Sequence, residues 1–227
     1  MIARIGVSVS DELLTLALTH RSFANEAKTT GLNVPNNERL EFLGDSVLGL
    51  VVTEELYRCF PDREEGQLSP LRSGVVNMKA LAGIARELDI GPYLRIGKGE
   101  ETTGGRDKSS ILADSLEALF GAIYLEHGFS IASEIILKLT RPVLQEAIDL
   151  GHGLDGKTAL QDLAASLALG SPEYSSVESG PDHDKSFVAT VKVAGEVLAS
   201  GDGKSKREAE QVAARTAYHV LSSRKIR

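Results

Sequence analysis

In NERLEFLGDSVLGL, residues 37–50, three carboxylates interrupt an otherwise apolar run. Charged residues seldom lie inside a hydrophobic helix without a partner. On a helical wheel with about 100° per residue, Glu38, Glu41 and Asp45 fall within about 60° of arc. The apolar residues on the opposite side are Leu40, Leu43, Val47, Leu50 and Val51. The stretch therefore predicts a helix with one apolar side and one narrow acidic face.

A second helix repeats this arrangement in LADSLEALFGAIYLE, residues 112–126. Asp114 and Glu117 are three residues apart and share a face, which Gly121 continues without a side chain. Gly49 lies on the acidic side of the first helix, so we expect another element to approach closely there. If the two acidic faces meet, up to five carboxylates converge, which is unfavourable unless cations neutralise them or some carboxyls stay protonated.

Hard divalent ions suit a site of this kind, because Mg²⁺ prefers octahedral oxygen coordination and commonly bridges to phosphate. Two such ions about 4 Å apart can activate water and stabilise the leaving oxygen in phosphodiester hydrolysis. The alternative is that the acids are solvated on separate amphipathic helices. A di-iron carboxylate bundle would require Glu-x-x-His pairs, and the sequence contains none.

The composition is that of an ordinary soluble globular protein, with 227 residues, 42% hydrophobic and 25% charged. No apolar stretch approaches the roughly 18 to 20 residues that cross a bilayer, and the N-terminus lacks the apolar core of a signal peptide. We therefore expect a cytoplasmic protein without a membrane partner. Cys59 is the only cysteine, which excludes an intrachain disulfide and a multi-cysteine zinc site.

The charge is divided unevenly along the chain. The net charge of −7 does not suggest a nucleic-acid binder. Residues 157–227, however, contain 10 basic and 9 acidic residues, whereas the preceding residues contain 15 and 23. Such a split between segments predicts different functions for the two parts.

The periodicity also changes along the chain. From residue 11 to about residue 149 it is helical almost throughout, with Gly128 closing one helix, Pro142 breaking or kinking the next, and Ser69 and Pro70 starting another. A glycine-rich polar segment, residues 96–110, is predicted to be a surface loop, either a mobile connection or a loop beside a ligand site.

A short glycine-rich linker then precedes a helix, three alternating strands and a final helix. The prediction is an all-α domain over residues 1–150, a linker over 151–156, and a small α+β domain with the order α-β-β-β-α over 157–227.

Three cations, Lys204, Lys206 and Arg207, lie at the start of the last predicted helix. The N-terminus of a helix already favours anions, so added cations there make a phosphate clamp. The alternative is a basic first turn that is merely solvated, although cations at this end oppose the helix dipole.

Several motifs resemble those of bacterial ribonuclease III. They are NERLEFLGDS from residue 37, THRSFANE from 19, LRSGVVN from 71, and KSSILADSLEALFGAIYLEHG from 108. The resemblance covers essentially the whole chain in the order of the family. It implies a dimeric, all-helical endonuclease domain that cleaves double-stranded RNA with Mg²⁺, for which Mn²⁺ is a conceivable substitute.

The resemblance also implies roles for the acids. Glu41, Asp45, Asp114 and Glu117 match the metal-binding residues, and Asp45 and Glu117 match those indispensable for cleavage. Glu38 matches a supporting acid, either in the same cleft or at the dimer interface.

Two further residues are left open. His20 could be a general base, although metal-bound water needs no histidine, and packing or hydrogen bonding near the cleft is the simpler role. Lys108 could contact phosphate or be solvated.

The C-terminal part resembles a double-stranded RNA-binding domain, a fold that spans about 16 base pairs. On this resemblance the first helix faces one minor groove, a strand-to-strand loop enters the next, and the last helix binds phosphate. The residues implied are Thr158, Gln161 and Asp162 on the helix, Pro181, Asp182 and His183 in the loop, and Lys204, Ser205, Lys206 and Arg207 at the phosphate site. Asp162 stands where the family usually carries Glu, and His183 could instead make only a structural hydrogen bond.

The implied reaction leaves 5′-phosphate and 3′-hydroxyl ends with a short 3′ overhang, on precursors of ribosomal RNA and on some messenger RNAs. The alternative is a protein that binds double-stranded RNA without cutting it. A catalytically dead relative would be expected to have lost some of its acids, and this sequence keeps every one that can be placed on the motifs, which favours the enzyme.

Overall fold

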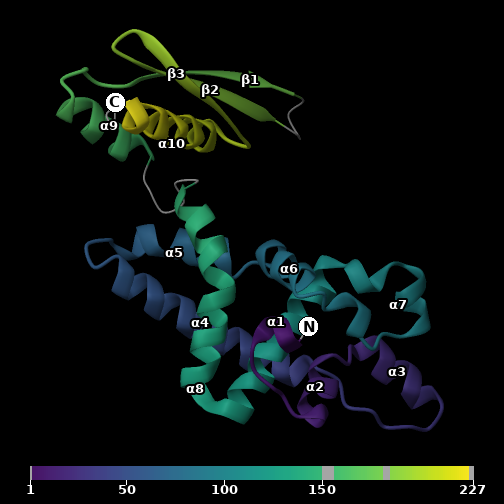
Figure 1. Cartoon of the computed structure of the whole chain (residues 1–227). Coiled ribbons are helices and arrows are strands. Elements are labelled where there is room, and N and C mark those ends of the chain that lie inside the picture. The colour runs from purple at the N-terminus through teal and green to yellow at the C-terminus, as the bar shows by residue number, and fades with distance from the viewer. Residues whose placement is uncertain (1, 150–155, 181–184, 225–227) are drawn as a thin grey trace. The chain divides into compact units, whose positions relative to one another are not determined.

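The computed structural model describes residues 2–149, 156–180 and 185–224 (Figure 1). Within these ranges the chain divides near residue 147 into two compact units, and both confirm the predicted fold class. The first unit is helical and consists of α1 (Ile2–Ile5), α2 (Asp11–Ala17), α3 (Arg21–Thr29), α4 (Glu38–Cys59), α5 (Glu65–Val75), α6 (Met78–Glu87), η1 (Gly91–Tyr93), α7 (Lys98–Thr102), η2 (Gly105–Asp107) and α8 (Ser109–Asp149). The second consists of α9 (Gly156–Ser166), β1 (Glu173–Ser179), β2 (Ser186–Val193), β3 (Glu196–Gly203) and α10 (Lys206–Arg224).

Helix α4 ends before Pro61 as predicted, because a residue that precedes proline disfavours the helical conformation. Its start is fixed by the buried Asn37. The side-chain amide of Asn37 donates to the carbonyl of Ala17 at 3.1 Å, and its backbone N–H donates to the carbonyl of Thr19 at 2.9 Å. These bonds attach the first turn of α4, which carries Glu41, to the end of α2.

The apolar side of α4 is only partly buried. Leu40, Val47 and Val51 lie in the core as predicted. Leu50, however, is 57% exposed, and Phe42 and Tyr57 are 79% and 74% exposed. At 100° per residue these three exposed side chains lie within about 80° of arc, so they form an apolar strip along the helix.

The sequence predicts interruptions of helices at Gly128 and at Pro142. Gly128 interrupts α8 as predicted, with φ 77° and ψ −179°. Pro142 does not end the helix, which continues to Asp149, because buried residues on both sides, Ile136 and Leu144 among them, hold it by packing.

The predicted start at Ser69 is wrong, since α5 already begins at Glu65. Among the described residues, no helix combines the length and apolar character needed to span a membrane.

The second unit contains an antiparallel sheet in the order β1-β2-β3, with α9 and α10 against one of its faces (Figure 1). Strand β2 alternates as a half-buried strand should, with Ala189, Val191 and Val193 buried toward the helices. Gly201 of β3 lies so close to α10 that an added Cβ atom would be 2.4 Å from the backbone nitrogen of Ala213. The small residues of this sheet therefore let the last helix pack directly on the strand backbone.

Candidate metal centre and nucleic-acid interface

Helices α4 and α8 cross with their backbones in direct contact. An ideal Cβ atom on Gly44 would lie 1.8 Å from the backbone oxygen of Glu117, and one on Gly121 would lie 2.4 Å from a backbone oxygen of α4. The close approach expected at Gly49 is wrong, because a Cβ atom there would have no neighbour within 4 Å. Sequence reasoning missed Gly44, although an isolated glycine inside a helix usually has a packing reason. Since Gly44 follows Glu41 by three residues, this crossing brings the acids of both helices together.

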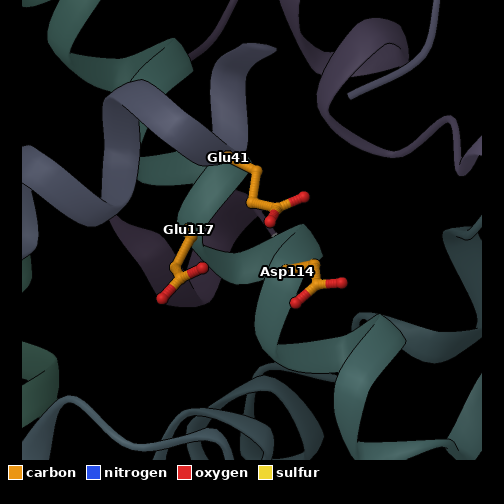
Figure 2. Close-up of side chains that lie close together, drawn as sticks. All are labelled: Glu41, Asp114 and Glu117. Atoms are coloured by element: carbon orange, nitrogen blue, oxygen red, sulfur yellow. The ribbon is translucent and has the colours of Figure 1, made fainter. Parts of the chain in front are cut away.

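Three carboxylates meet at the crossing (Figure 2). One oxygen each of Glu41, Asp114 and Glu117 lies within 4.8 Å of the others, and all three side chains are half-buried. Asp45 and Glu38 lie outside this group, and both are exposed. The structure thus brings together three of the four predicted metal ligands, with Asp45 one helical turn farther along α4.

The acids interact electrostatically even where they are not in contact. Burial, followed by the charges of Asp45, Asp114 and Glu41, raises the pKa of Glu117 to about 8. Burial also raises the pKa of Glu41 and of Asp114. For Asp114, the nearby charges of His20 and Arg21 partly offset this rise. At neutral pH and without a cation, Glu117 therefore retains its proton.

Glu38 lies at the edge of the group and has partners of its own. Its Oε1 is 3.5 Å from Nη1 of Arg21, and its Oε2 accepts a hydrogen bond from Nδ2 of Asn36 at 2.9 Å. The Arg21 pair is long and solvent-exposed, so it contributes little to stability. These contacts fit a supporting position better than that of a ligand.

His20 caps helix α3. Its Nδ1 accepts a hydrogen bond from the backbone N–H of Ser22 at 3.2 Å and lies 2.8 Å from the Ser22 hydroxyl. Burial lowers the pKa of His20, although the charges of Glu100 and Asp114 oppose this effect. Burial thus favours the neutral ring, and the hydrogen bond to the start of α3 holds it in place, which fits a packing and hydrogen-bonding role.

The predicted loop of residues 96–110 contains α7 and η2 and is tied to α3. The Ser22 hydroxyl accepts from the backbone N–H of Gly97 at 2.9 Å, and the Glu26 carboxylate accepts from the N–H of Lys98 at 2.7 Å. Sequence reasoning did not identify these two side chains. Lys108 forms an ion pair with Glu100, and the hydrogen bond from Lys108 lowers the pKa of Glu100. Lys108 therefore already has a partner within the segment.

In the second unit, the predicted groove-facing residues of α9 form one exposed face. Thr158, Gln161 and Asp162 are all exposed, whereas Leu160 and Ala164 on the other side of the helix are buried in the core. The spacing of three and four residues is that of one side of a helix. Pro181, Asp182 and His183 lie outside the described residues.

The predicted phosphate site lies at the start of α10, where Lys204, Ser205, Lys206 and Arg207 are exposed. The Ser205 hydroxyl accepts from the backbone N–H of Glu208 at 3.2 Å, and the Glu208 carboxylate accepts from the N–H of Lys204 at 2.7 Å. This is close to a capping box, in which a Ser and a Glu three residues apart satisfy free N–H groups at the helix start. Ser205 therefore shapes the turn that presents the cations.

Comparison with known proteins covers both units. Residues 10–143 match the Ribonuclease-III-like family, and residues 157–221 match the double-stranded RNA binding motif. The chain is 60% identical to Ribonuclease 3 of Thermobifida fusca over 217 residues, which are 96% of this chain and 89% of that protein. It is 55% identical to Ribonuclease 3 of Streptomyces coelicolor over 218 residues, which are 96% of this chain and 78% of that protein.

Solved structures agree with the sequence comparison. The nuclease domain of ribonuclease III from Campylobacter jejuni is 45% identical, with a TM-score of 0.57 over 62% of this chain and 94% of that one. The first matched range contains Glu41, Asp114 and Glu117, and the second contains the exposed face of α9 and the basic start of α10. The chain belongs to the ribonuclease III family of endoribonucleases.

Proposed function

We propose that the acidic group at the crossing of α4 and α8 binds divalent metal, Mg²⁺ with Mn²⁺ as a substitute, and that the chain uses it to hydrolyse double-stranded RNA. The observation that supports this proposal is the approach of three carboxylates from two helices within 4.8 Å. Bare carboxylates so close repel one another, and burial together with this repulsion raises the pKa of Glu117.

The side chains at the crossing fit the proposed ion. They offer only carboxylate oxygens, which hard cations such as Mg²⁺ and Mn²⁺ prefer, and water can complete the coordination. When bound, such an ion polarises a phosphoryl oxygen and lowers the pKa of coordinated water. A cation also removes the reason for Glu117 to remain protonated.

The residues of the chain then have distinct roles. Glu41, Asp114 and Glu117 hold the ion, and Gly44 keeps their two helices at the required spacing. On the family resemblance we assign Asp45, one helical turn beyond Glu41, as a further ligand that acts with Glu117 in catalysis; its charge also raises the pKa of Glu117, after burial. Glu38 supports the group from its edge.

The second unit binds the double-stranded RNA. Its exposed α9 face, with Thr158, Gln161 and Asp162, is suited to a minor groove, and Lys204, Lys206 and Arg207 are suited to backbone phosphates. Local cations explain how a chain with net charge −7 binds a polyanion. We also assign Pro181, Asp182 and His183 to the neighbouring groove, on the family resemblance alone.

We further propose that the chain is a homodimer. The solved Campylobacter jejuni structure is described as showing flexibility in a region involved in dimer formation of that nuclease domain. In this chain, Phe42, Leu50 and Tyr57 form an exposed apolar strip on α4, and water contact with such a strip is unfavourable. A second copy that covers this strip would place two metal sites in one assembly.

The remaining assignments follow the family. The nuclease domain spans 1–150 and the RNA-binding domain 157–227, with 151–156 as linker, a division that the matched ranges 10–143 and 157–221 support. Products carry 5′-phosphate and 3′-hydroxyl ends with short 3′ overhangs. The substrates are precursors of ribosomal RNA and some messenger RNAs, and the site of action is the cytoplasm.

The test is cleavage of a long end-labelled duplex RNA by the full-length protein, with Mg²⁺ or with EDTA, beside the two separated strands. We expect fragments with short 3′ overhangs only when the duplex is incubated with protein and Mg²⁺, and none from the separated strands or in EDTA. An intact duplex in Mg²⁺, with binding still measurable, would instead identify a protein that only binds double-stranded RNA.

A further inference from the structure

Helix α9 begins in direct contact with α10. The backbone N–H of Gly156 donates to the side-chain oxygen of Gln211 at 2.9 Å. A Cβ atom on Gly156 would lie 2.7 Å from Cγ of Arg215 and 2.9 Å from the backbone oxygen of Gln211, so the two helices touch at this glycine. The first residue of α9 is therefore held against the middle of α10.

The next residue makes a second attachment to α10. Nζ of Lys157 forms an ion pair with Oε2 of Glu210 at 2.6 Å and lies 4.6 Å from the centre of the Tyr174 ring. The Glu210 side chain is 12% exposed and that of Lys157 is 38% exposed, so water and salt screen this pair less than they would a fully exposed one. We call Gly156, Lys157, Glu210 and Gln211 the α9–α10 latch.

The latch lies between the two surfaces assigned to RNA. On α9, Thr158 of the groove-facing surface follows Lys157 directly. On α10, Lys206 of the phosphate site lies one turn before Glu210, and its Nζ is 4.0 Å from Oε1 of Glu210. Glu210 thus pairs through one oxygen with Lys157, the residue directly before the RNA-facing surface of α9, and approaches a cation of the other surface with its second oxygen.

We propose that Glu210, through its pair with Lys157, is a positioning residue for recognition of double-stranded RNA. It fixes the spacing between the groove-facing residues of α9 and the cations of α10. The proposal rests on the proposed function of these two surfaces. Because an A-form duplex presents its grooves and phosphates at a set spacing, a protein whose surfaces are already held at that spacing binds with a smaller loss of conformational freedom.

The sign of the expected effect separates positioning from simple electrostatics. Removal of an acid beside cations should strengthen binding to a polyanion if charge alone matters. Removal of a positioning residue should weaken binding instead. For Glu210→Ala in the full-length protein we expect about five- to tenfold weaker binding, with the same dependence on salt because every phosphate-binding cation remains.

The experiment is fluorescence anisotropy with a labelled RNA duplex longer than about 16 base pairs, in EDTA to prevent cleavage, over a range of salt concentrations. Lys157→Met keeps the side-chain stem over Tyr174 and should show a similar loss. The double variant should bind no more weakly than either single variant, because both remove the same contact. Glu173→Ala removes an exposed acid from the start of β1 and should bind at least as tightly as the wild type.

Cleavage provides a second measurement. With Mg²⁺, Glu210→Ala should raise KM and leave kcat unchanged, because the metal site is untouched. Binding equal to or tighter than that of the wild type, or additive losses in the double variant, would overturn the latch. If replacement of Lys204, Lys206 and Arg207 with Ala left the salt dependence unchanged, the proposed phosphate site would fail independently of the latch.

Discussion

Replacement of Glu117 by Gln should stabilise the metal-free protein while it abolishes cleavage. Gln has nearly the shape of the protonated acid, but it cannot ionise. In the folded wild type the pKa of Glu117 is about 8, against an ordinary value of 4.5. Between these two values the unfolded chain releases a proton that the folded chain retains, so the stability of the wild type falls as pH rises through this window. The Gln variant has no such loss.

The size of the effect follows from the same pKa. Each unit is worth about 1.4 kcal/mol, so a rise from 4.5 to about 8 corresponds to at most about 5 kcal/mol. Glu117 is only half-buried and solvent screens its charge, so about 2 kcal/mol is expected at pH 8. For a protein of this size that is an increase in Tm of roughly 4 to 8 °C.

Thermal unfolding in EDTA at pH 5 and pH 8 measures this difference. The gain of Glu117→Gln should be small at pH 5, large at pH 8, and reduced when Mg²⁺ stabilises the wild type. Glu12→Gln changes the same charge at an exposed position of α2 and should shift the Tm little at either pH. Equal Tm values of wild type and Glu117→Gln at pH 8 would show that Glu117 does not retain its proton in the folded protein, and cleavage by the variant at the wild-type rate would show that Glu117 is not required for cleavage.

Three further substitutions test separate parts of the account. Gly44→Ala should lower the free energy of unfolding by more than about 3 kcal/mol in chemical denaturation and should abolish cleavage, because the added Cβ atom would meet the backbone of Glu117. The control Gly49→Ala should be tolerated, since a Cβ atom there has no neighbour within 4 Å. Phe42→Ala should weaken the dimer at least about tenfold in sedimentation equilibrium, whereas Leu32→Ala, which also removes an exposed apolar side chain, should leave it intact. Ser205→Ala should cost about 1 kcal/mol of stability through loss of the cap and leave the salt slope of RNA binding unchanged; a flattened slope would show that the hydroxyl contributes to phosphate binding instead.

The acidic group could be predicted from sequence because helical periodicity is local. Glu41 on one helix, and Asp114 with Glu117 on another, lie on faces that a wheel identifies without knowledge of the fold. The wheel gives the side of a helix but not the position along its axis at which a partner crosses. That position depends on the contact between two backbones, and so Gly44 was missed in favour of Gly49.

Contacts between distant segments were also beyond the sequence patterns. Asn37 bonds to the end of α2, and Gly156 bonds to Gln211, which is 55 residues away. No local spacing indicates either contact. Likewise the exposure of Phe42 and Leu50 depends on how much of α4 its neighbours cover, whereas the strands of the second unit follow from simple alternation.

The proposed function requires that the carboxylates at the crossing of α4 and α8 hold the divalent ion. Electron paramagnetic resonance of free Mn²⁺ tests this directly, in a titration of the full-length wild type, Glu117→Gln and Glu12→Gln. The wild type and Glu12→Gln should remove Mn²⁺ from solution alike, and Glu117→Gln should bind it far more weakly. Equal binding of Mn²⁺ by Glu117→Gln and the wild type would show that these carboxylates do not hold the ion.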